Sequence, residues 1–484
     1  MSFIRLNQAF HLRRQAIRIV KRVAVIGGGQ TGLVTAATLL ADGFTSVRVF
    51  CPEEELKISN PVSGRLPAGI VSSYLERFAA RHCTDSASYG TRVLSMARRK
   101  DRERGWDLRV KTLATDEESL QSFDKVVICT GAFNRQKIPS SLRGRSRFRG
   151  PVVHASELGP RHQEILDVVP DKTNDDPEPQ SQAQVVVVGG GKSASDAATW
   201  FAMQGRRVTL ESYWHIPLPE RKPPDFLRRS RRLLHNTRLG AWFIRAMYGA
   251  LEAKTTKELG LAPDSRLRSK TSLFWGGRPA GPTDIKDPTG FFALVDSGAI
   301  NLIAPAHVLD YDTSGTSLLL DNEQTIPAAA VVLGTGFGVS HAAFMDDAAR
   351  AQAGLIPQAP GSRDFTGDPQ NCYVAECTAH WIASYFRADP FPAFTQDELI
   401  EEPERESAWL RFRYPADECF ADREVGCNTA DALTNWPWYA DTLMEDMGVR
   451  SQRSGRLWGL WMFQTIDVEE LKMLGEERRV KRQG

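Results

Sequence analysis

The N-terminal part of the chain contains a strand–turn–helix signature that few folds can accommodate. Residues 23–26 are consecutive apolar residues, as in a buried parallel strand, and an apolar helical stretch begins a few residues later. The turn between them has the pattern G-x-G-x-x-G, formed by Gly27, Gly29 and Gly32. The first glycine permits a tight turn, the second lets backbone approach a pyrophosphate, and the third lets helix and strand pack closely. We therefore predict a dinucleotide-binding turn, with Gln30 and Thr31 beside the phosphates, over the alternative of a glycine turn without a ligand.

A second copy of this pattern begins at Val185. Four valines are followed by a turn that carries small residues at the same three positions, Gly189, Gly191 and Ala194. Alanine at the third position still permits close packing of helix on strand. Lys192 and Ser193 lie inside the turn and are further candidates for phosphate binding. Two such turns in one chain predict one bound redox cofactor and one exchangeable nicotinamide coenzyme.

The residues that would contact the riboses are less regular. Dinucleotide folds often place an acidic residue at the end of the second strand, but Cys51 follows the predicted strand 47–50, so Glu53 is the nearest candidate. In the second copy Glu211 follows the strand 208–210, as an NAD-type ribose ligand would. Four cations near it in sequence would instead suit the 2′-phosphate of NADPH, namely Arg206, Arg207, Arg221 and Lys222. The residues alone leave the choice between NADH and NADPH open.

Composition places the chain among soluble globular proteins of more than one domain. It has 484 residues, of which 42% are hydrophobic and 25% charged, and its net charge of +2 gives no indication of a nucleic-acid partner. Seven cysteines are too few and too scattered for a disulfide framework. Cys372 and Cys377 are the closest pair, but neither a second pair nor a histidine cluster completes a metal site, so we predict reduced thiols and no metal.

Two basic segments bear on localisation and partners. Residues 1–22 carry arginines and lysines without an acid, which suits a solvated tail of a cytoplasmic protein or, as the alternative, a mitochondrial presequence. Between Arg228 and Leu251 an arginine-rich stretch leads into an apolar helical pattern that includes Trp242 and Phe243. We favour a packed lid or domain-bridging helix here over a helix on a membrane surface. Oligomeric state is not indicated.

Four motifs in order give the chain its resemblance to a known family. The pattern F-x-G-x-x-x-H lies in the sequence between the glycine turns GGGQTG (27–32) and GGGKSA (189–194). Two further turns at strand ends have the sequences CTG (129–131) and GTG (334–336). The members of the F-x-G-x-x-x-H pattern are Phe148, Gly150 and His154. This combination resembles the flavin-containing monooxygenases, and fungal members in particular, for which a role in secondary metabolism is expected.

The resemblance implies that NADPH reduces a bound FAD, and that a C4a-(hydro)peroxyflavin then transfers one atom of O₂ to a small apolar substrate at nitrogen, sulfur or carbon. It implies further cofactor contacts at the strand-end turns, from Thr130, Gly131 and Gly336. His154 is the one motif residue with acid–base capacity, and we weigh a catalytic role for it against a hydrogen-bonding role that orients the link between domains.

The segment after Phe50 departs from the family pattern. Family members carry a longer stretch there, and its absence keeps two alternatives open: a nucleotide-binding pseudoenzyme, or an NAD(P)H oxidase or flavin reductase with an incomplete flavin site. The residues after His154 also lack the pattern of relatives that convert ketones to esters.

We predict an α/β fold with two doubly wound, Rossmann-like domains, the nicotinamide domain being inserted in the FAD domain. After a basic tail (1–22), the expected parts are an FAD domain (23–156 and 296–400), a nicotinamide domain (157–295) and a helical extension (401–484). The turns at Gly131 and Gly336 are the expected entrance and exit of the inserted domain. The charged end, 476–484, is expected to fray.

Overall fold

We describe the protein from a computed structural model. Its described residues are 22–53, 68–99, 105–131, 135–139, 142, 147–171, 183–211, 289–304, 306–338, 344–346, 349–350, 372–389, 436–451, 453 and 468–483, with ten further positions between 238 and 257. The predicted shortening of the segment after Phe50 concerns mainly residues 54–67, which lie outside this set. Within the described part of the chain, no helix has both the length and the apolar character needed to cross a bilayer.

The first unit is built on a four-stranded parallel sheet in the order β3-β2-β1-β7. Its strands are β1 (Val23–Ile26), β2 (Val47–Phe50), β3 (Ala87–Ser88) and β7 (Lys125–Ile128). One face packs against three helices, α2 (Gln30–Ala41), α3 (Ala68–His82) and α10 (Cys372–Arg387). Alternation along β1 sends Val23 and Val25 to this helical face, as the period of two requires.

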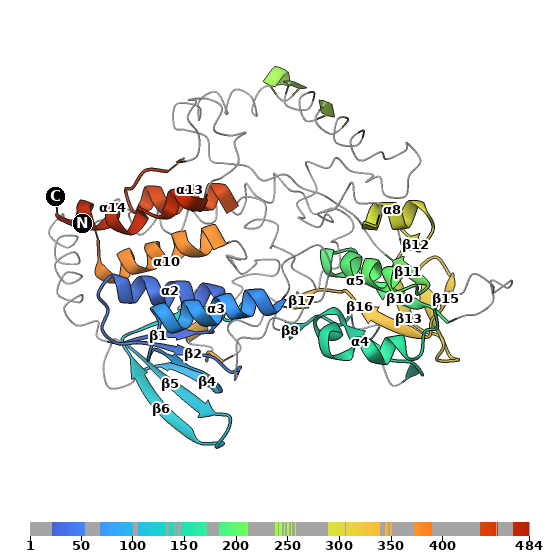
Figure 1. Ribbon diagram of the computed structural model, residues 1–484, viewed down its shortest axis with the longest axis horizontal. Helices are drawn as coiled ribbons and strands as arrows, with labels where there is room; N and C mark the ends of the chain where they lie inside the picture. The colour runs from blue at the N-terminus through green and yellow to red at the C-terminus, as the bar shows by residue number, and fades with distance from the viewer. Residues whose placement is uncertain are drawn as a thin grey trace.

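The opposite face of this sheet is covered by an antiparallel meander. Its strands are β4 (Thr91–Arg98), β5 (Trp106–Thr112) and β6 (Glu118–Phe123). Ala24, Ile26 and Phe50 pack against its buried face, so every residue of β1 is buried. Figure 1 shows the meander below the parallel sheet and the helices above it. Both faces of the parallel sheet are therefore covered, as all-parallel sheets require.

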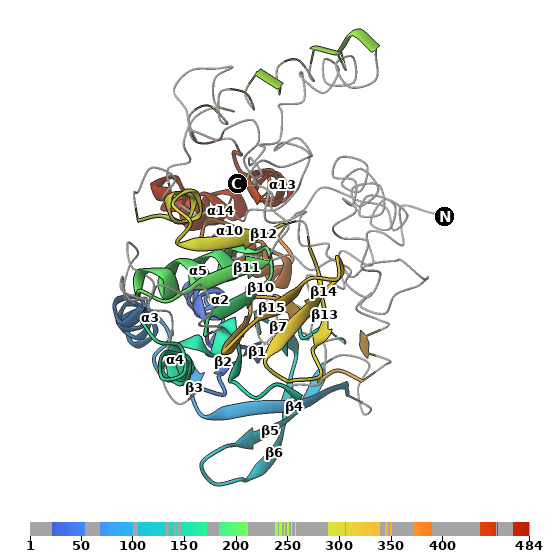
Figure 2. The same cartoon turned by 90° about the vertical axis from the view of Figure 1, so that its right-hand side faces the viewer.

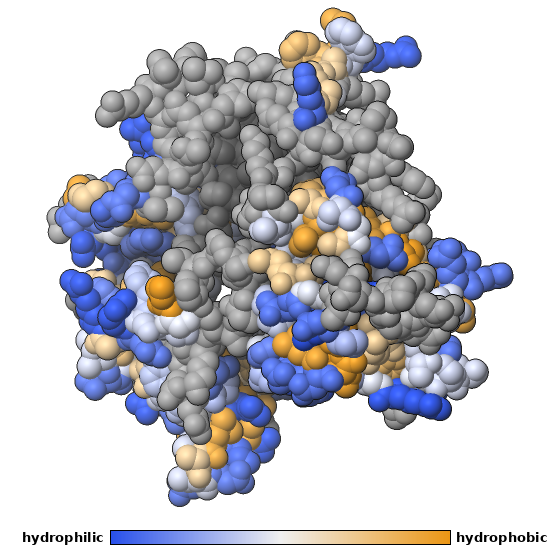
Figure 3. Space-filling view, turned by 45° about the vertical axis from the view of Figure 1, so that its right-hand side comes forward, coloured by the Kyte–Doolittle hydropathy of each residue, from blue (hydrophilic) through white to orange (hydrophobic). Residues whose placement is uncertain are grey.

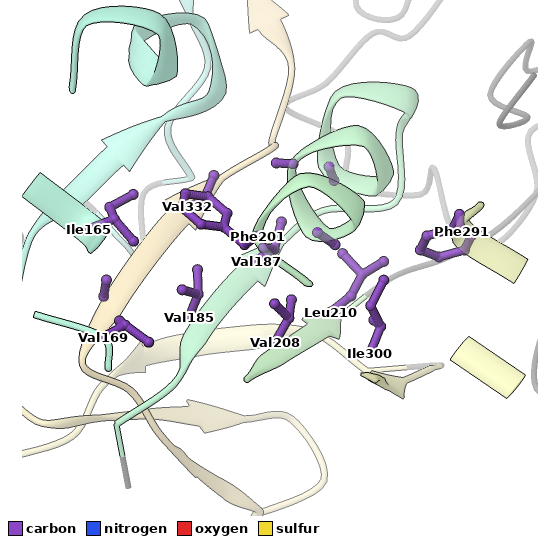
Figure 4. Close-up of a cluster of buried hydrophobic side chains, with 14 of the residues drawn as sticks. Ile165, Val169, Val185, Val187, Phe201, Val208, Leu210, Phe291, Ile300 and Val332 are labelled. Carbon is purple, nitrogen blue, oxygen red and sulfur yellow. The ribbon is translucent and has the colours of Figure 1, made fainter. Parts of the chain in front are cut away.

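The second unit repeats the same three layers. Its parallel sheet has the order β12-β11-β10-β16-β9, from β9 (Val152–His154), β10 (Val185–Val188), β11 (Val208–Glu211), β12 (Ile300–Ile303) and β16 (Ala330–Leu333). Helices cover one face, namely α4 (Leu158–Leu166), α5 (Lys192–Met203) and α8 (Phe291–Asp296). Figure 4 shows Val185 and Val187 of β10 in this core with Phe201 of α5. A second meander covers the other face, from β13 (Val308–Tyr311), β14 (Ser317–Leu320) and β15 (Thr325–Pro327).

Sheet pairing differs from the expected division at residues 157 and 296. β12 and β16, which we had assigned to the second half of the FAD domain, pair with β11 and β10 in the second sheet. β9, assigned to the first half, pairs with β16 in the same sheet. Neighbouring strands of a parallel sheet are joined by long crossover connections, so they can be far apart in the sequence. Sequence order alone therefore does not show which strands pair. We propose that the inserted unit lies between the turns at Gly131 and Gly336.

The two links between the units run side by side. β8 (Arg135–Gln136) follows the first turn and pairs antiparallel with β17 (Phe337–Gly338), which follows the second. Figure 1 shows both short strands between the two units. The backbone of Lys137 donates to the carbonyl of Gly336 (3.0 Å), and Thr335 Oγ donates to the carbonyl of Lys137 (2.5 Å).

The end of the chain is a docked helix, so the expected fraying is wrong for the described residues. α14 (Leu474–Gln483) places Arg478, which is 2% exposed, against the first unit. The Arg478 guanidinium donates to Asp42 Oδ2 (2.7 Å), at the C-terminal end of α2, and to Ser384 Oγ of α10 (2.7 Å). α13 (Trp436–Asp446) packs on α10 through Leu443 and Met444, which accords with the expected helical extension. Figure 2 shows α10, α13 and α14 close together.

Candidate functional site

The first glycine turn lies at the carboxyl end of β1, where α2 begins. Gly27 has φ of +117°, and a Cβ atom there would overlap the carbonyl oxygen of Cys129 at the end of β7. Glycine is therefore required by both conformation and space. At Gly29 a Cβ would meet nothing within 4 Å, and no side chain caps the helix that starts after it. The first N–H groups of α2 thus have no capping side chain, and such groups are the ordinary partners of a phosphate.

Glu53 lies close to the end of β2, where Cys51 occupies the position at which dinucleotide folds often have an acidic residue. The Cys51 thiol donates to Glu53 Oε2 (3.0 Å), and Cys51 packs so closely on the turn that a Cβ at Gly28 would lie 2.6 Å from its sulfur. Burial, followed by the hydrogen bond to Glu53, raises the pKa of the Cys51 thiol to about 12. The thiol therefore remains protonated and holds the exposed Glu53 carboxylate beside the glycine turn. This position suits a ribose hydroxyl, and the role of Glu53 stays a prediction.

The second glycine turn has the same geometry with one exchange of residues. Gly189 has φ of +130°, and a Cβ at Gly191 would meet nothing within 4 Å. The N-terminus of α5 again has no capping side chain. At the third position Ala194 is buried against Gly334, where a Cβ would lie 2.5 Å from that of Ala194. The turn thus has room for a second pyrophosphate beside Gly191, and Gly334 of the GTG turn packs against α5, the helix that follows the glycine turn.

Several predicted coenzyme residues fall elsewhere. Arg207 directly precedes β11, and its carbonyl accepts from the first residue of β10, so it lies at the amino edge of the sheet. The glycine turn is at the carboxyl edge, where ligands of such sheets bind, so the backbone of Arg207 lies away from the turn, and its contact with the coenzyme stays a prediction. Arg206 lies next to it and forms an ion pair with Asp171. Ser193 is exposed at the start of α5, whereas the side chains of Lys192, Glu211, Arg221 and Lys222 lie outside the described set.

His154 connects the second sheet to the link between the units. Its side chain is 1% exposed, and its Nε2 lies 3.0 Å from the carbonyl oxygen of Gly336. Nδ1 accepts from the backbone N–H of Ser156 (3.2 Å) and contacts Ser156 Oγ (2.8 Å). Because a carbonyl can only accept, Nε2 carries the proton and the ring is neutral. Both ring nitrogens are thus engaged, and the geometry favours the orienting role over proton transfer to a substrate.

The remaining predicted residues lie at the strand-end turns. Gly131 (φ +75°) and Gly336 (φ +78°) adopt conformations that favour glycine, and both follow strands whose carboxyl ends adjoin a glycine turn. Thr130 stands beside the first turn, since its backbone nitrogen would lie 3.1 Å from a Cβ at Gly27. Contacts of Thr130, Gly131 and Gly336 with a cofactor stay predictions.

Known proteins share parts of this sequence, including the two glycine turns. A family described as pyridine nucleotide-disulphide oxidoreductase matches residues 21–238, which include both glycine turns. The FAD-dependent monooxygenase resA of Aspergillus sclerotiorum is 31% identical over 38% of this chain and 36% of its own length. Monooxygenase aurF of Gibberella zeae is 25% identical over 72% of this chain and 68% of its own, and flavin-containing monooxygenase 1 of Rattus norvegicus is 23% identical over 49% and 52%.

Over these parts of its length the chain is similar to flavin-dependent monooxygenases. Solved structures show that it shares their fold. An oxidized steroid monooxygenase bound to NADP aligns with a TM-score of 0.56, at 15% identity, over 89% of this chain and 98% of that one. A complex of OTEMO with FAD and NADP aligns with a TM-score of 0.52, at 14% identity, over 81% and 90%.

The cysteines near the first glycine turn do not form a pair with the spacing used in dithiol chemistry. Residues 22–131 of the first unit contain Cys51, Cys83 and Cys129, none of them at the C-x-x-C or C-x₄-C spacing that thiol chemistry beside a flavin would need. Desolvation raises the pKa of Cys83 to about 11 and that of Cys129 to about 12. Cys377, from the distant C-x₄-C pair, is a buried free thiol in α10 whose pKa is also raised by burial. Thiols of this kind are poor nucleophiles at neutral pH.

Proposed function

We propose that this protein is an FAD-dependent monooxygenase that takes electrons from NADPH and transfers one atom of O₂ to a small apolar organic substrate. The observation that carries the proposal is the pair of open glycine turns at the carboxyl edges of two separate parallel sheets. Each turn heads a helix without a capping side chain, so each suits one pyrophosphate. The similarity to resA, aurF and a flavin-containing monooxygenase supports the choice of reaction.

The two turns are assigned different cofactors. The first turn, with Gly27, Gly29 and Gly32, would hold FAD, which supplies the hydride acceptance and oxygen chemistry when bound. Glu53 would accept from a ribose hydroxyl of the same cofactor, held in place by the Cys51 thiol. The order of the motifs and the two structures described with NADP among the neighbours support this assignment.

The second turn would hold the pyrophosphate of NADPH on the N-terminus of α5. The paired links β8 and β17, fixed to β9 through His154 and Gly336, would keep the second unit oriented toward the first. A nicotinamide bound to one unit can reduce a flavin bound to the other only if this orientation is kept, because hydride transfer needs contact between the reacting atoms. His154 therefore acts as a positioning residue in this proposal.

The test is the visible spectrum of the purified protein during one cycle of reduction and reoxidation. A flavin spectrum that NADPH bleaches without air, and that returns when O₂ is admitted, supports the proposal. Substrate screening should then show oxygenated product in step with NADPH consumed. A colourless protein that still binds NADPH would contradict it in favour of a pseudoenzyme, and NADPH consumption matched by peroxide with every substrate tried would identify an oxidase instead.

A further inference from the structure

The C-terminal helix α14 has no role in the proposed function. The same holds for the segment between Arg228 and Leu251, which we expected to form a packed lid, but most of that segment lies outside the described residues. The outward side of α14 carries exposed charged residues such as Glu476 and Arg479, and the space-filling view shows mainly hydrophilic surface there (Figure 3). On the inward side, the side chain of Arg478 is only 1% exposed. Burying a guanidinium costs free energy unless it is paired, so the partners of Arg478 indicate what α14 holds.

Arg478 joins α14 to two helices of the first unit. Its Nη2 donates to Asp42 Oδ2 (2.7 Å), at the C-terminal end of α2. Its Nε donates to Ser384 Oγ (2.7 Å) and its Nη1 donates to His380 Nδ1 (2.6 Å), both on α10. A planar guanidinium that uses all three of its nitrogens fixes the relative positions of the groups that it binds. Arg478 therefore sets where the end of α2 lies relative to α10 and α14.

Asp42 is held by further cations. Its side chain is 3% exposed, and Arg482 Nη1 of α14 also contacts its Oδ2 (3.4 Å). Its backbone carbonyl accepts from Arg387 Nη1, in the last turn of α10. Asp389 adds a second carboxylate, whose Oδ2 lies 3.6 Å from Arg482 Nη1 and 3.9 Å from Arg478 Nη2. We call these five residues, from Asp42 to Arg482, the α2 clamp.

The clamp acts at one end of α2 and the first glycine turn lies at the other. Apolar side chains such as Leu33 and Leu39 pack the helix between these ends. Hydrophobic contact has no preferred direction, so it resists separation of the helix from its neighbours more than movement along the helix axis. The hydrogen bonds of the clamp are directional. They therefore fix the axial position of α2, and with it the position of the uncapped N–H groups at its N-terminus.

We propose that Arg478 is a positioning residue for the pyrophosphate of FAD and acts through α2. The inference rests on the proposed function, because it needs FAD at the first glycine turn. α2 has 12 residues, so the clamp lies about 18 Å from the turn, where paired charges have little direct effect on a phosphate. The effect passes through the helix as a rigid body. An axial shift of about 1 Å would take its N–H groups out of hydrogen-bond distance of the phosphate oxygens.

Two simpler roles for the clamp have different consequences. A clamp that only adds stability would leave the FAD affinity of the folded protein unchanged when Arg478 is replaced. Desolvation offsets much of the attraction within a buried ion pair, so stability alone is a weak reason for the cluster. A clamp that acts only by placing positive charge at the C-terminal end of α2 would work equally well with lysine, which keeps the charge but lacks the planar fork.

The test is titration with FAD of the full-length protein from which flavin has been removed, well below its unfolding temperature. Arg478→Met should raise the Kd for FAD by about tenfold, because displacement of a binding group by about 1 Å lowers affinity strongly. Arg478→Lys should also raise it, since lysine cannot reproduce the three hydrogen bonds. The ³¹P resonances of bound FAD should shift in both variants. The Kd for NADPH, at the turn of the second unit, should not change.

Lys481→Met is the matched control. It also removes one positive charge from α14, but Lys481 Nζ donates to the carbonyl of Met447 at the end of α13 (2.8 Å) and not to α2. This variant loosens the docking of α14 without touching the clamp. Its Kd for FAD and its ³¹P resonances should therefore match those of the unmodified protein, while its unfolding midpoint falls.

Three results would overturn the inference. An unchanged Kd for FAD in Arg478→Met, with a lower unfolding midpoint, would reduce the clamp to a structural role. An unchanged Kd in Arg478→Lys would assign the effect to charge, and this variant decides the question if Arg478→Met does not fold. An equal rise of the Kd in Lys481→Met would show that any loosening of α14 has the same effect. Unmodified protein that binds no FAD would overturn the proposed function as well, whereas the first three results leave that function intact.

Discussion

Ala194 and Gly334 are complementary in size. Ala194 stands at the third position of the second glycine turn, and a Cβ at Gly334 would lie 2.5 Å from the Ala194 Cβ and 2.8 Å from its Cα. In the first unit the closest constraint is within the turn, since a Cβ at Gly32 would lie 1.9 Å from the Gly27 carbonyl oxygen and 3.5 Å, an ordinary contact, from the Cβ of Cys129. The close contact between helix and strand end at Ala194 and Gly334 is therefore a feature of the second unit.

We expect Gly334→Ala to destabilise the protein by about 1–3 kcal/mol, because a methyl group would be forced into a closed contact. Ala194→Gly alone should cost about 1 kcal/mol through helix propensity. The double variant should recover at least about 1 kcal/mol relative to the sum of the single changes. Urea unfolding of the four proteins measures this coupling, and strict additivity would show that the two residues do not compete for space.

Gly29→Ala and Gly191→Ala should separate the two cofactors. At both positions a Cβ meets no protein atom within 4 Å, and neither glycine has a positive φ, so the melting temperature should change little. The new methyl group would instead occupy the space where a pyrophosphate approaches the backbone. We expect Gly29→Ala to lower flavin content, and Gly191→Ala to raise the Kd for NADPH with flavin content unchanged. If both variants bind both cofactors normally, the glycine turns are not the sites.

Replacing His154 by Phe tests its orienting role. Phenylalanine can keep the edge contact with Phe337 but loses both hydrogen bonds, so we expect a loss of about 1–3 kcal/mol in stability. Reduction of bound flavin by NADPH should slow, while flavin content stays unchanged. Ser156→Ala is the control, since it removes the hydroxyl contact to Nδ1 and the hydrogen bond that Ser156 Oγ accepts from Gln136 Nε2 (3.2 Å) but keeps the contact between His154 and Gly336. A catalytic acid–base role would instead appear as a lost limb in the pH profile of turnover with reduction unaffected.

His380 should make stability depend on pH through the docked C-terminal helix. Its Nδ1 accepts from Arg478 Nη1 (2.6 Å), and burial, followed by the charge of Arg478, lowers its pKa from 6.5 to about 4. Between these two pH values the His380 imidazole therefore binds a proton in the unfolded chain but stays neutral in the folded protein. Stability should be complete above pH 6.5 and should fall by up to about 3 kcal/mol as the pH drops to 4.

The variant His380→Gln checks this assignment, because an amide oxygen can accept from Arg478 but does not titrate. Its free energy of unfolding should lose the slope between pH 6.5 and pH 4 that the unmodified protein shows. An identical slope in both proteins would place the effect on other groups. Glu157 and Asp312 have lowered pKa values and contribute with the same sign, but only as the pH falls below their ordinary values of 4.5 and 3.8.

Much of the fold was predictable because its signals are local. The strand at 23–26, the turn at 27–32 and the helix after it were confirmed, as were the strand at 185–188 and its turn. In such elements an apolar run and a glycine with positive φ are required by the backbone itself, whatever surrounds them.

The sequence by itself determined that two glycine turns exist, since their spacing expresses a local backbone requirement at Gly27 and Gly189. Tertiary structure decided the rest, because it depends on which distant segments come together. It placed β12 and β16 in the second sheet, Arg207 at the edge away from the turn, and Gly334 against Ala194. It also buried Arg478 of the charged C-terminal end against Asp42, more than four hundred residues away. The charges at the C-terminal end predict an exposed segment. The burial of Arg478 depends on its partner Asp42, which only the folded structure reveals.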